Sequence, residues 1–165
     1  MTTLSRLLCL RLGCLALLSL ALPACSSAVN GPGGRISKVK YHHLMPWQPV
    51  RTTDPALIFE RQYLLHGAVT AAEMNDRFGH YYSVFWKANE RDAGQVTVRF
   101  EYLQAQAGLK KRVQELVVDD VRRSNVSKFQ VTGDEYHKSG RVTAWRVSVL
   151  RGGEELVSQQ SALWN

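Results

Sequence analysis

Histidine side chains are the first residues to consider, because imidazole is the commonest side-chain ligand of metal ions. His42 and His43 form an adjacent pair. Adjacent residues of an extended chain point to opposite faces, so these two rings are not expected to bind one ion. The other histidines have no partner at ligand spacing, and they are His66, His80 and His137. The sequence therefore predicts no metal site and no cofactor.

Motifs of known catalytic sites are also missing from the sequence. It has no Gly-x-Ser-x-Gly elbow, no Walker loop, no His-Glu-x-x-His pattern and no dinucleotide fingerprint. The paired carboxylates Asp119-Asp120 and Glu154-Glu155 lie in predicted loops, where solvated side chains are the ordinary explanation. We therefore expect a protein that is not an enzyme.

Cys25 is the residue whose surroundings point to a defined chemical modification. It follows a basic stretch with Arg6 and Arg11 and an apolar run over residues 12–22. This order is typical of an export signal, and the run is too short to cross about 30 Å of hydrocarbon as a stable helix. We predict a signal peptide over residues 1–24.

The residues Leu22-Pro23-Ala24-Cys25 resemble the lipobox of bacterial lipoproteins, although Ala or Ser is usual where Pro23 stands. The resemblance implies that Cys25 carries lipid and that acyl chains hold the protein on a membrane. Because Ser26 is not an aspartate, it also implies an outer-membrane address facing the periplasm. The alternative is cleavage after Ala28, which would release a soluble secreted protein.

Composition indicates one folded domain behind this signal. Hydrophobic residues make up 45% and charged residues 21%, which excludes a disordered chain and a multi-span membrane protein. All three cysteines lie at or before residue 25, so the folded part has no disulfide. The formal net charge is +7, and 19 basic against 14 acidic residues remain without Arg6 and Arg11. We interpret this excess as scattered surface charge that suits lipid headgroups or peptidoglycan, and not as a nucleic-acid footprint.

Glycines and prolines divide the mature chain. Residues 25–35 have no apolar period and predict a lipidated cysteine with a flexible tether. Residues 36–55 contain three prolines, which favour an extended segment lying across the domain, with Trp47 as its contact. Residues 56–165 are predicted to form the domain itself.

The pattern of this domain is typical of an all-β, immunoglobulin-like or fibronectin-like antiparallel sandwich of about seven strands. Alternation is clearest over residues 95–103, and a glycine turn at Gly152-Gly153 predicts a hairpin between strands at 141–150 and 156–163. Thr70 and Glu73 match a capping box and predict one helical turn. Further strands are expected at 58–69, 80–88, 110–118 and 126–132.

Tyr81, Tyr82 and Phe85 are the candidate ligand-binding residues, because clustered aromatic rings can stack on sugars. Alternation along a strand sends Tyr82 to the face opposite Tyr81 and Phe85, so only one group can form a platform. Core packing is the competing explanation for aromatic residues in strands, and we expect it for Trp86 and Trp145.

Two hypotheses of function follow. The first is a membrane-anchored lipoprotein of the cell envelope, whose non-catalytic sandwich binds or scaffolds envelope proteins. The second is a glycan-binding module that uses exposed aromatic residues. A flat, solvent-exposed row of Tyr81, Tyr82 or Phe85 would favour the second hypothesis over the first.

Overall fold

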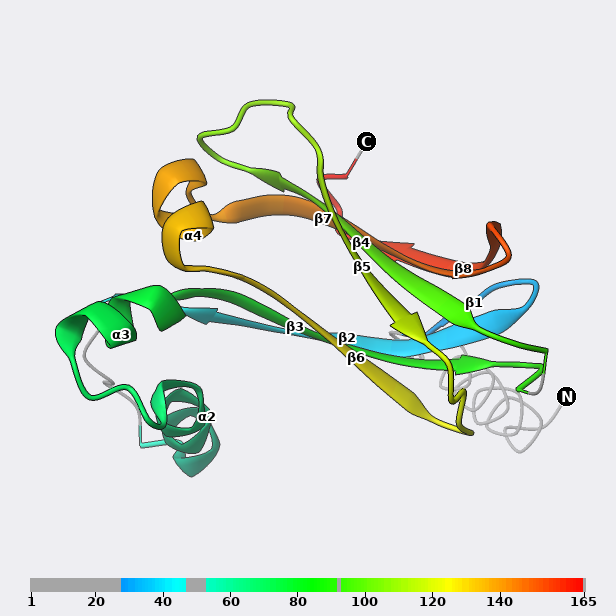
Figure 1. The fold of residues 1–165 in the computed structure, drawn as a ribbon, viewed down its shortest axis with the longest axis horizontal. Helices are drawn as coiled ribbons and strands as arrows, with labels where there is room; N and C mark the ends of the chain where they lie inside the picture. Colours follow the sequence, from blue (N-terminus) through cyan, green and yellow to red (C-terminus); the bar gives the residue numbers. More distant parts are fainter. Residues whose placement is uncertain (1–27, 47–52, 92, 165) are drawn as a thin grey trace, which may run out of the picture.

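The computed structural model describes residues 28–46, 53–91 and 93–164, which form two four-stranded sheets packed face to face (Figure 1). Every pair of neighbouring strands is antiparallel. Sheet A has the order β1-β2-β3-β6, with β1 (Val29–Asn30), β2 (Gly34–Leu44), β3 (Gly79–Ala88) and β6 (Asn125–Thr132). Sheet B has the order β5-β4-β7-β8, with β5 (Arg112–Val118), β4 (Val96–Gln104), β7 (Val142–Arg151) and β8 (Glu154–Gln160).

The strand order is that of an immunoglobulin-like sandwich, which confirms the predicted fold class. The chain changes sheet between β3 and β4, between β5 and β6, and between β6 and β7. β4 and β7 are paired although β5 and β6 separate them along the chain, which is a Greek-key connection. Counted from β2 as the first strand of the domain, β5 is the fourth strand. It pairs with β4 and so lies in sheet B, whereas the fourth strand of a constant-type immunoglobulin domain lies in the other sheet.

Three short helices lie at one end of the sandwich (Figure 1). α2 (Pro55–Leu65) and α3 (Ala71–Arg77) precede β3, and α4 (Gly133–Ser139) connects β6 to β7. α2 lies on the outer side of sheet A, away from sheet B. None of the helices in the described part of the chain is long and apolar enough to span a membrane.

The core lies between the sheets and follows the predicted alternation. The inward residues are buried, namely Val96, Val98, Phe100 and Tyr102 on β4, and Tyr82, Val84 and Trp86 on β3. The Phe100 ring lies 4.6 Å from that of Tyr82 and 5.2 Å from that of Phe129, which joins the two sheets. The Trp86 indole donates a hydrogen bond of 3.0 Å to Ser127 Oγ, so its buried N–H is satisfied.

Trp145 contributes less to the core than Trp86. It shares a face of β7 with the fully buried Val147 and Val149, as predicted, and its ring lies 6.0 Å from that of Tyr82. The Trp145 side chain is nevertheless only half-buried against the edge of the core. The predicted strand register is confirmed, whereas the predicted depth of Trp145 is greater than observed.

The glycine hairpin is confirmed. Gly152 and Gly153 have φ angles of 57° and 88°, in the left-handed region that favours glycine. Arg151 pairs directly with Glu154 across this turn. β8 therefore begins at Glu154, two residues earlier than expected.

The strand predicted at 58–69 is wrong, because this segment forms α2. Asp54 Oδ1 accepts a hydrogen bond of 2.9 Å from the backbone N–H of Ala56, and Pro55 occupies the first turn of the helix. An aspartate cap followed by proline is a helix start signal. The apolar residues of the segment also occur in consecutive runs and not in alternation, which suits a helix better than a half-buried strand.

The Thr70 capping box is confirmed. The backbone N–H of Glu73 donates to Thr70 Oγ1 at 3.2 Å, and the backbone N–H of Thr70 donates to Glu73 Oε2 at 2.9 Å. α3 extends to Arg77 and is longer than the single turn predicted. The Arg77 guanidinium donates to the backbone oxygen of Leu64 at 3.1 Å, which holds α3 against α2.

The predicted tether is shorter than expected, because residues 28–35 belong to the sandwich. β1 pairs with the start of β2, and the backbone N–H of Gly33 donates to the backbone oxygen of Leu156 at 3.1 Å. A Cβ atom on Gly31 would lie 2.2 Å from that same oxygen. The glycines of this segment therefore permit close backbone packing against β8 and do not indicate a flexible linker.

The segment predicted to lie extended across the domain is in part a strand of sheet A. β2 pairs with β3 along its length, from Gly34 opposite Ala88 to Leu44 opposite Gly79. The folded domain therefore begins before residue 56. Residues 47–52, which include Trp47, lie outside the described part of the chain.

Candidate functional site

The outer surface of sheet A carries charge of one sign. Within the described bounds of its strands, sheet A has no Asp or Glu. It has five exposed basic residues, which are Arg35, Lys38, Lys40, Lys87 and Lys128. None of these five forms an ion pair with a described carboxylate. Because no described carboxylate forms an ion pair with them, they give this sheet an excess of positive charge.

Sheet B has balanced charges. Its strands contain four arginines, Arg99, Arg112, Arg146 and Arg151, and four glutamates, Glu101, Glu115, Glu154 and Glu155. Arg99 Nε lies 2.6 Å from Glu115 Oε1, and Arg146 Nη2 lies 2.8 Å from Glu155 Oε2. Arg112 pairs with Glu135 of α4 at 3.1 Å.

Glu155 is a carboxylate that lies beside two hydroxyl groups on sheet B. Ser158 Oγ donates to Glu155 Oε1 at 2.6 Å, and Ser148 Oγ donates to Oε2 at 3.1 Å. Burial alone would raise the pKa of Glu155, but these two hydrogen bonds and the Arg146 guanidinium hold the pKa below its usual value. A carboxylate with a lowered pKa is a weaker proton acceptor than a free one.

The basic residues of sheet A surround the outer side chains of β3. The strand register places Lys38 opposite Phe85, and Lys40 and Lys128 on either side of Ser83. Lys38 Nζ lies 4.8 Å from the centre of the Phe85 ring, which is a cation–π contact. Phe85 therefore lies beneath a lysine side chain and is not free to stack on a sugar. We call the outer surface of β2, β3 and β6 the basic face.

The three candidate aromatic residues divide between the two sides of sheet A, as alternation predicts. Tyr82 is buried in the core, whereas Tyr81 and Phe85 are half-buried on the basic face. The Tyr81 hydroxyl donates a hydrogen bond of 2.6 Å to the backbone oxygen of Arg77. Burial raises the pKa of Tyr81, and the Arg77 charge partly opposes this effect. The three rings therefore do not form a flat exposed row.

A cleft of about 340 Å³ lies between α2 and the basic face. His42 Nδ1 lies 3.6 Å from Glu60 Oε2 and links the helix to β2. The polar side chains of the cleft include two tyrosines, one lysine, one glutamate, a serine hydroxyl and an amide, which suits a hydroxylated ligand. Its side-chain lining includes Glu60, Tyr63 and Leu64 from α2, and Tyr81, Ser83, Lys128 and Gln130 from the sheet.

His43 lies on the inner side of sheet A next to His80, whereas His42 lies on the outer side. The predicted opposite orientation of His42 and His43 is confirmed. The rings of His43 and His80 stack at 4.0 Å, and His43 Nε2 lies 2.8 Å from the Tyr136 hydroxyl oxygen. His80 Nε2 accepts a hydrogen bond of 3.2 Å from the backbone N–H of Val142. Burial, and then the charge of His43, lowers the pKa of His80 to about 3, so the His80 ring is neutral in the fold. Among the described residues, no group of three or more His, Cys, Asp or Glu side chains could hold a metal ion.

Cys25 and the predicted signal over residues 1–24 lie outside the described residues, so lipid attachment stays a prediction. The described chain begins at Ala28 and enters β1, which is the edge strand of sheet A. This edge also packs against β8 of sheet B, through the hydrogen bond from the Gly33 backbone N–H to the Leu156 backbone oxygen.

The interpretation of scattered surface charge misses the grouping of Lys38, Lys40 and Lys128. Each residue looks like an ordinary solvated side chain when its strand is considered alone. The available signal is that the strands around these lysines contain no carboxylate. That signal gains meaning only when β6 is known to pair with β3 and not with its sequence neighbour β5.

Comparisons with known proteins find two distantly similar structures. No family model and no curated protein matches the chain. An immunoglobulin-like protein from Pseudomonas aeruginosa has a similar structure, with a TM-score of 0.35 and 14% identity over 50% of this chain and 69% of that chain. A protein from Akkermansia muciniphila is similar with a TM-score of 0.43 and 11% identity, over 81% of this chain and 74% of that chain.

Proposed function

We propose that the protein is a lipid-anchored binding module of the cell envelope, which holds an anionic partner on its basic face. The immunoglobulin-like sandwich acts as a non-catalytic scaffold, and Cys25 attaches it to the periplasmic side of the outer membrane. The observation that carries this proposal is the segregation of charge. Sheet A has five unpaired basic residues and no carboxylate in its described strands, whereas the charges of sheet B are balanced.

Unpaired charges of one sign weaken the domain that carries them. Lys40 and Lys128 lie on strands that flank β3, both beside Ser83, and cations on nearby strands repel each other. An anionic partner neutralises these charges when it binds. The relief of lysine–lysine repulsion then adds to the free energy of binding. The positive potential also steers anions towards the face and raises their rate of encounter.

The lipid anchor and the basic face support each other in this proposal. The Cys25 thiol forms a thioether to diacylglycerol, and each buried methylene contributes about 0.8 kcal/mol to membrane attachment. An anchored domain meets partners of the same envelope at a high effective concentration. At this effective concentration, weak contacts made by individual lysines are sufficient to keep the domain bound to an anionic partner.

Metabolic labelling with an alkyne fatty acid tests the anchor. The wild-type chain should be labelled and should sediment with outer membranes, whereas Cys25→Ser should lose both properties. Label that survives in Cys25→Ser, or a mature N-terminus at Val29, would show that the anchor is wrong.

Retention on a phosphate-bearing cation-exchange matrix tests the face. The face variant, Lys38→Gln with Lys40→Gln and Lys128→Gln, should elute at clearly lower salt than wild type. The control variant, Lys110→Gln with Lys111→Gln and Lys138→Gln, removes the same charge from exposed positions outside sheet A. If retention depends on net charge alone, the two variants will elute together and the face has no special role.

Glycan binding is a second candidate function, and the cleft beside α2 is the observation that favours it. Tyr63 and Tyr81 both line this cleft and can contact the apolar side of a sugar ring. A glycan array probed with the mature chain should then give signals that Tyr81→Ala removes. Phe85→Ala should leave those signals intact, because Phe85 does not line the cleft. An array without signals would remove this candidate.

A further inference from the structure

We infer that the anionic partner is the bilayer itself, and that the basic face and α2 form one membrane-facing side that lies on acidic phospholipid headgroups. This inference rests on the proposed anchor and basic face and names their partner. Sheet B, with its balanced charges, then faces the aqueous compartment.

The start of the described chain places one edge of the sandwich, where β1 packs against β8, next to the proposed anchor. Ala28 precedes β1 at the edge of sheet A, and Cys25 lies three residues before Ala28. Three extended residues reach at most about 11 Å. A lipid on Cys25 therefore holds this edge of the sandwich near the headgroup layer, whereas a tether up to residue 35 would leave the domain free to turn away.

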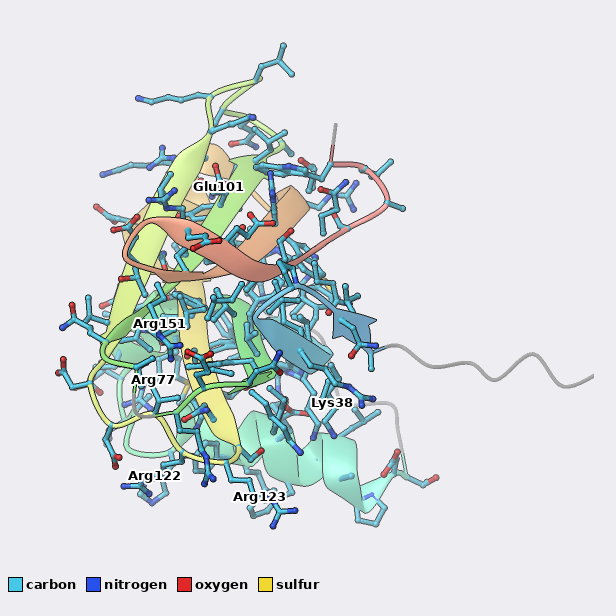
Figure 2. All side chains as sticks on the ribbon, turned by 90° about the vertical axis from the view of Figure 1, so that its right-hand side faces the viewer. Lys38, Arg77, Glu101, Arg122, Arg123 and Arg151 are labelled. Atoms are coloured by element: carbon cyan, nitrogen blue, oxygen red, sulfur yellow. The ribbon has the colours of Figure 1, made fainter. Side chains whose placement is uncertain are left out.

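The cations of the membrane-facing side lie on the same side of the molecule as one another. Figure 2 shows Lys38, Arg122 and Arg123 on one side of the molecule and Glu101 of sheet B on the opposite side. Arg122 and Arg123 are exposed in the loop before β6, and only Arg122 has a described carboxylate partner, Asp120 at 2.9 Å. Each Lys or Arg held near an anionic membrane strengthens binding by about 5-fold. The attraction fades within a Debye length of about 8 Å, so only residues on this side contribute fully.

α2 adds apolar side chains to the same side. Leu57, Phe59 and Tyr63 are 47%, 67% and 62% exposed, and the rings of Phe59 and Tyr63 stack at 6.3 Å. No residue of α2 is buried, so the core does not explain why this helix is apolar. Figure 1 shows α2 projecting from the outer side of sheet A. Exposed leucine and aromatic residues next to lysines are typical of segments that lie in a bilayer interface.

The two parts of this side distinguish a bilayer from a soluble anion. A free phosphate group or an acidic solute is attracted by the lysines alone. A bilayer is attracted by the lysines and also takes up Phe59 and Tyr63 from water. Binding that requires both sets of residues therefore identifies the membrane as the partner.

Vesicle sedimentation measures this binding directly. The chain from Ser26 to Asn165 carries no acyl group and contains every buried residue of the described core, from Ile36 onwards. It should bind vesicles made of equal parts phosphatidylglycerol and phosphatidylcholine. It should bind pure phosphatidylcholine vesicles at least about 100-fold more weakly, because several cations lose their anionic partners. Equal binding to both vesicles would overturn the inference.

Substitutions then test each part of the membrane-facing side. On the acidic vesicles, the face variant should lose about 100-fold in binding, whereas the control variant should lose less than about 5-fold. The double variant Phe59→Ala with Tyr63→Ala should lose about 10-fold on vesicles. Its retention on the phosphate matrix should stay unchanged, because it keeps every cation. Equal losses in the face and control variants, or vesicle binding unaffected by the loss of Phe59 and Tyr63, would contradict a membrane-facing side.

A competition separates the membrane from soluble phosphate. Inorganic phosphate that replaces chloride at constant ionic strength should leave the vesicle-bound fraction unchanged. Release by phosphate would assign the basic face to a soluble anion, which contradicts this inference and leaves the proposed function standing. If the wild-type protein takes up no fatty-acid label, by contrast, the anchor is refuted. The vesicle result is unaffected, because the chain from Ser26 to Asn165 carries no lipid.

Discussion

The two sheets share one core but present different surfaces to solvent. On sheet B, Arg99 and Arg146 each lie within 2.8 Å of a glutamate oxygen of a neighbouring strand. On sheet A, Lys38, Lys40 and Lys128 have no described carboxylate partner and lie around the half-buried Phe85 and Ser83. The inner faces are alike, because both contribute alternating apolar residues to the same cluster.

This difference shows how charge on one fold can serve two purposes. Cross-strand ion pairs of opposite sign add a little to stability and leave no net field. Unpaired cations reduce stability slightly and create a field that attracts anions. The predictions below test whether sheet B is built for stability and sheet A for binding, and whether both depend equally on the shared core.

Removal of a core tryptophan should have the largest effect. Trp86 of sheet A is fully buried, so Trp86→Ala removes apolar contacts and leaves a cavity, at a cost of about 3 to 5 kcal/mol in the free energy of unfolding. Trp145 of sheet B is half-buried, so Trp145→Ala should cost clearly less. Urea unfolding of both variants measures the difference. The milder Trp86→Phe serves if Trp86→Ala does not fold, and a larger loss for Trp145 would reverse our assignment of core depth.

As the pH falls, the first loss in the free energy of unfolding should come from His80 of sheet A. Burial and the charge of His43 lower the pKa of His80 from 6.5 to about 3 in the fold. Between these two pH values the unfolded chain binds a proton that the folded chain does not. The free energy of unfolding should therefore fall as the pH falls below 6.5, by up to about 1.4 kcal/mol per pH unit.

The matched variant for this effect is His80→Gln, which keeps an acceptor for the backbone N–H of Val142. Its free energy of unfolding should vary much less with pH between 6.5 and about 4.5. A slope equal to that of wild type would mean that another group causes the acid sensitivity.

Sheet B should respond at lower pH and more weakly, through Glu155. Hydrogen bonds from Ser158 and Ser148 and the Arg146 charge lower the pKa of Glu155 from 4.5, although burial opposes them. The stabilisation is therefore present above about pH 4.5 and is lost as the pH falls through the lower pKa of the folded state. Because the Glu155 side chain is 39% exposed, the loss should be only about 0.5 to 1 kcal/mol. Glu155→Gln should show this loss at neutral pH and no further loss below pH 4.5, as measured by thermal unfolding across the pH range.

Substitutions that remove one charge should change the free energy of unfolding least. The change should have opposite signs on the two sheets. Arg99→Gln breaks the pair with Glu115 and should lower the free energy of unfolding by about 0.2 to 1 kcal/mol. Lys40→Gln relieves repulsion on the basic face and should raise it by a few tenths of a kcal/mol. Both effects should shrink at high salt, because salt screens exposed charges. Destabilisation by Lys40→Gln would show that this lysine has a stabilising role and would weaken the contrast between the sheets.

Local patterns predicted much of the architecture. Alternation located β4, β3 and β7, the paired glycines located the β7–β8 turn, and the Thr70 capping box located α3. Each of these features depends on interactions between residues close in the chain, so the local sequence contains the necessary information. The same reasoning failed at α2, where apolar residues were matched to a strand although Asp54 and Pro55 form a helix start.

The candidate site was only partly accessible to such reasoning. Alternation correctly separated Tyr82 from Tyr81 and Phe85, but it could not show that Lys38 lies over the Phe85 ring. The sequence around Gly31 and Gly33 predicts a tether, because glycine suits both a flexible linker and a close backbone contact. The contact with Leu156 on β8, far along the chain, decides between these two roles.

The amino-acid sequence by itself determined the class of fold, the hairpin turn, the Thr70 capping box and the faces of individual strands, because these depend on spacing within a few residues. Tertiary structure alone decided which strands became neighbours. β2 and β6 both pair with β3 although they lie far apart in the chain, and this pairing gathers Lys38, Lys40 and Lys128 on one face. Electrostatic fields add over distances in space and not along the chain, so a cationic face assembled from separate strands exists only in the folded molecule.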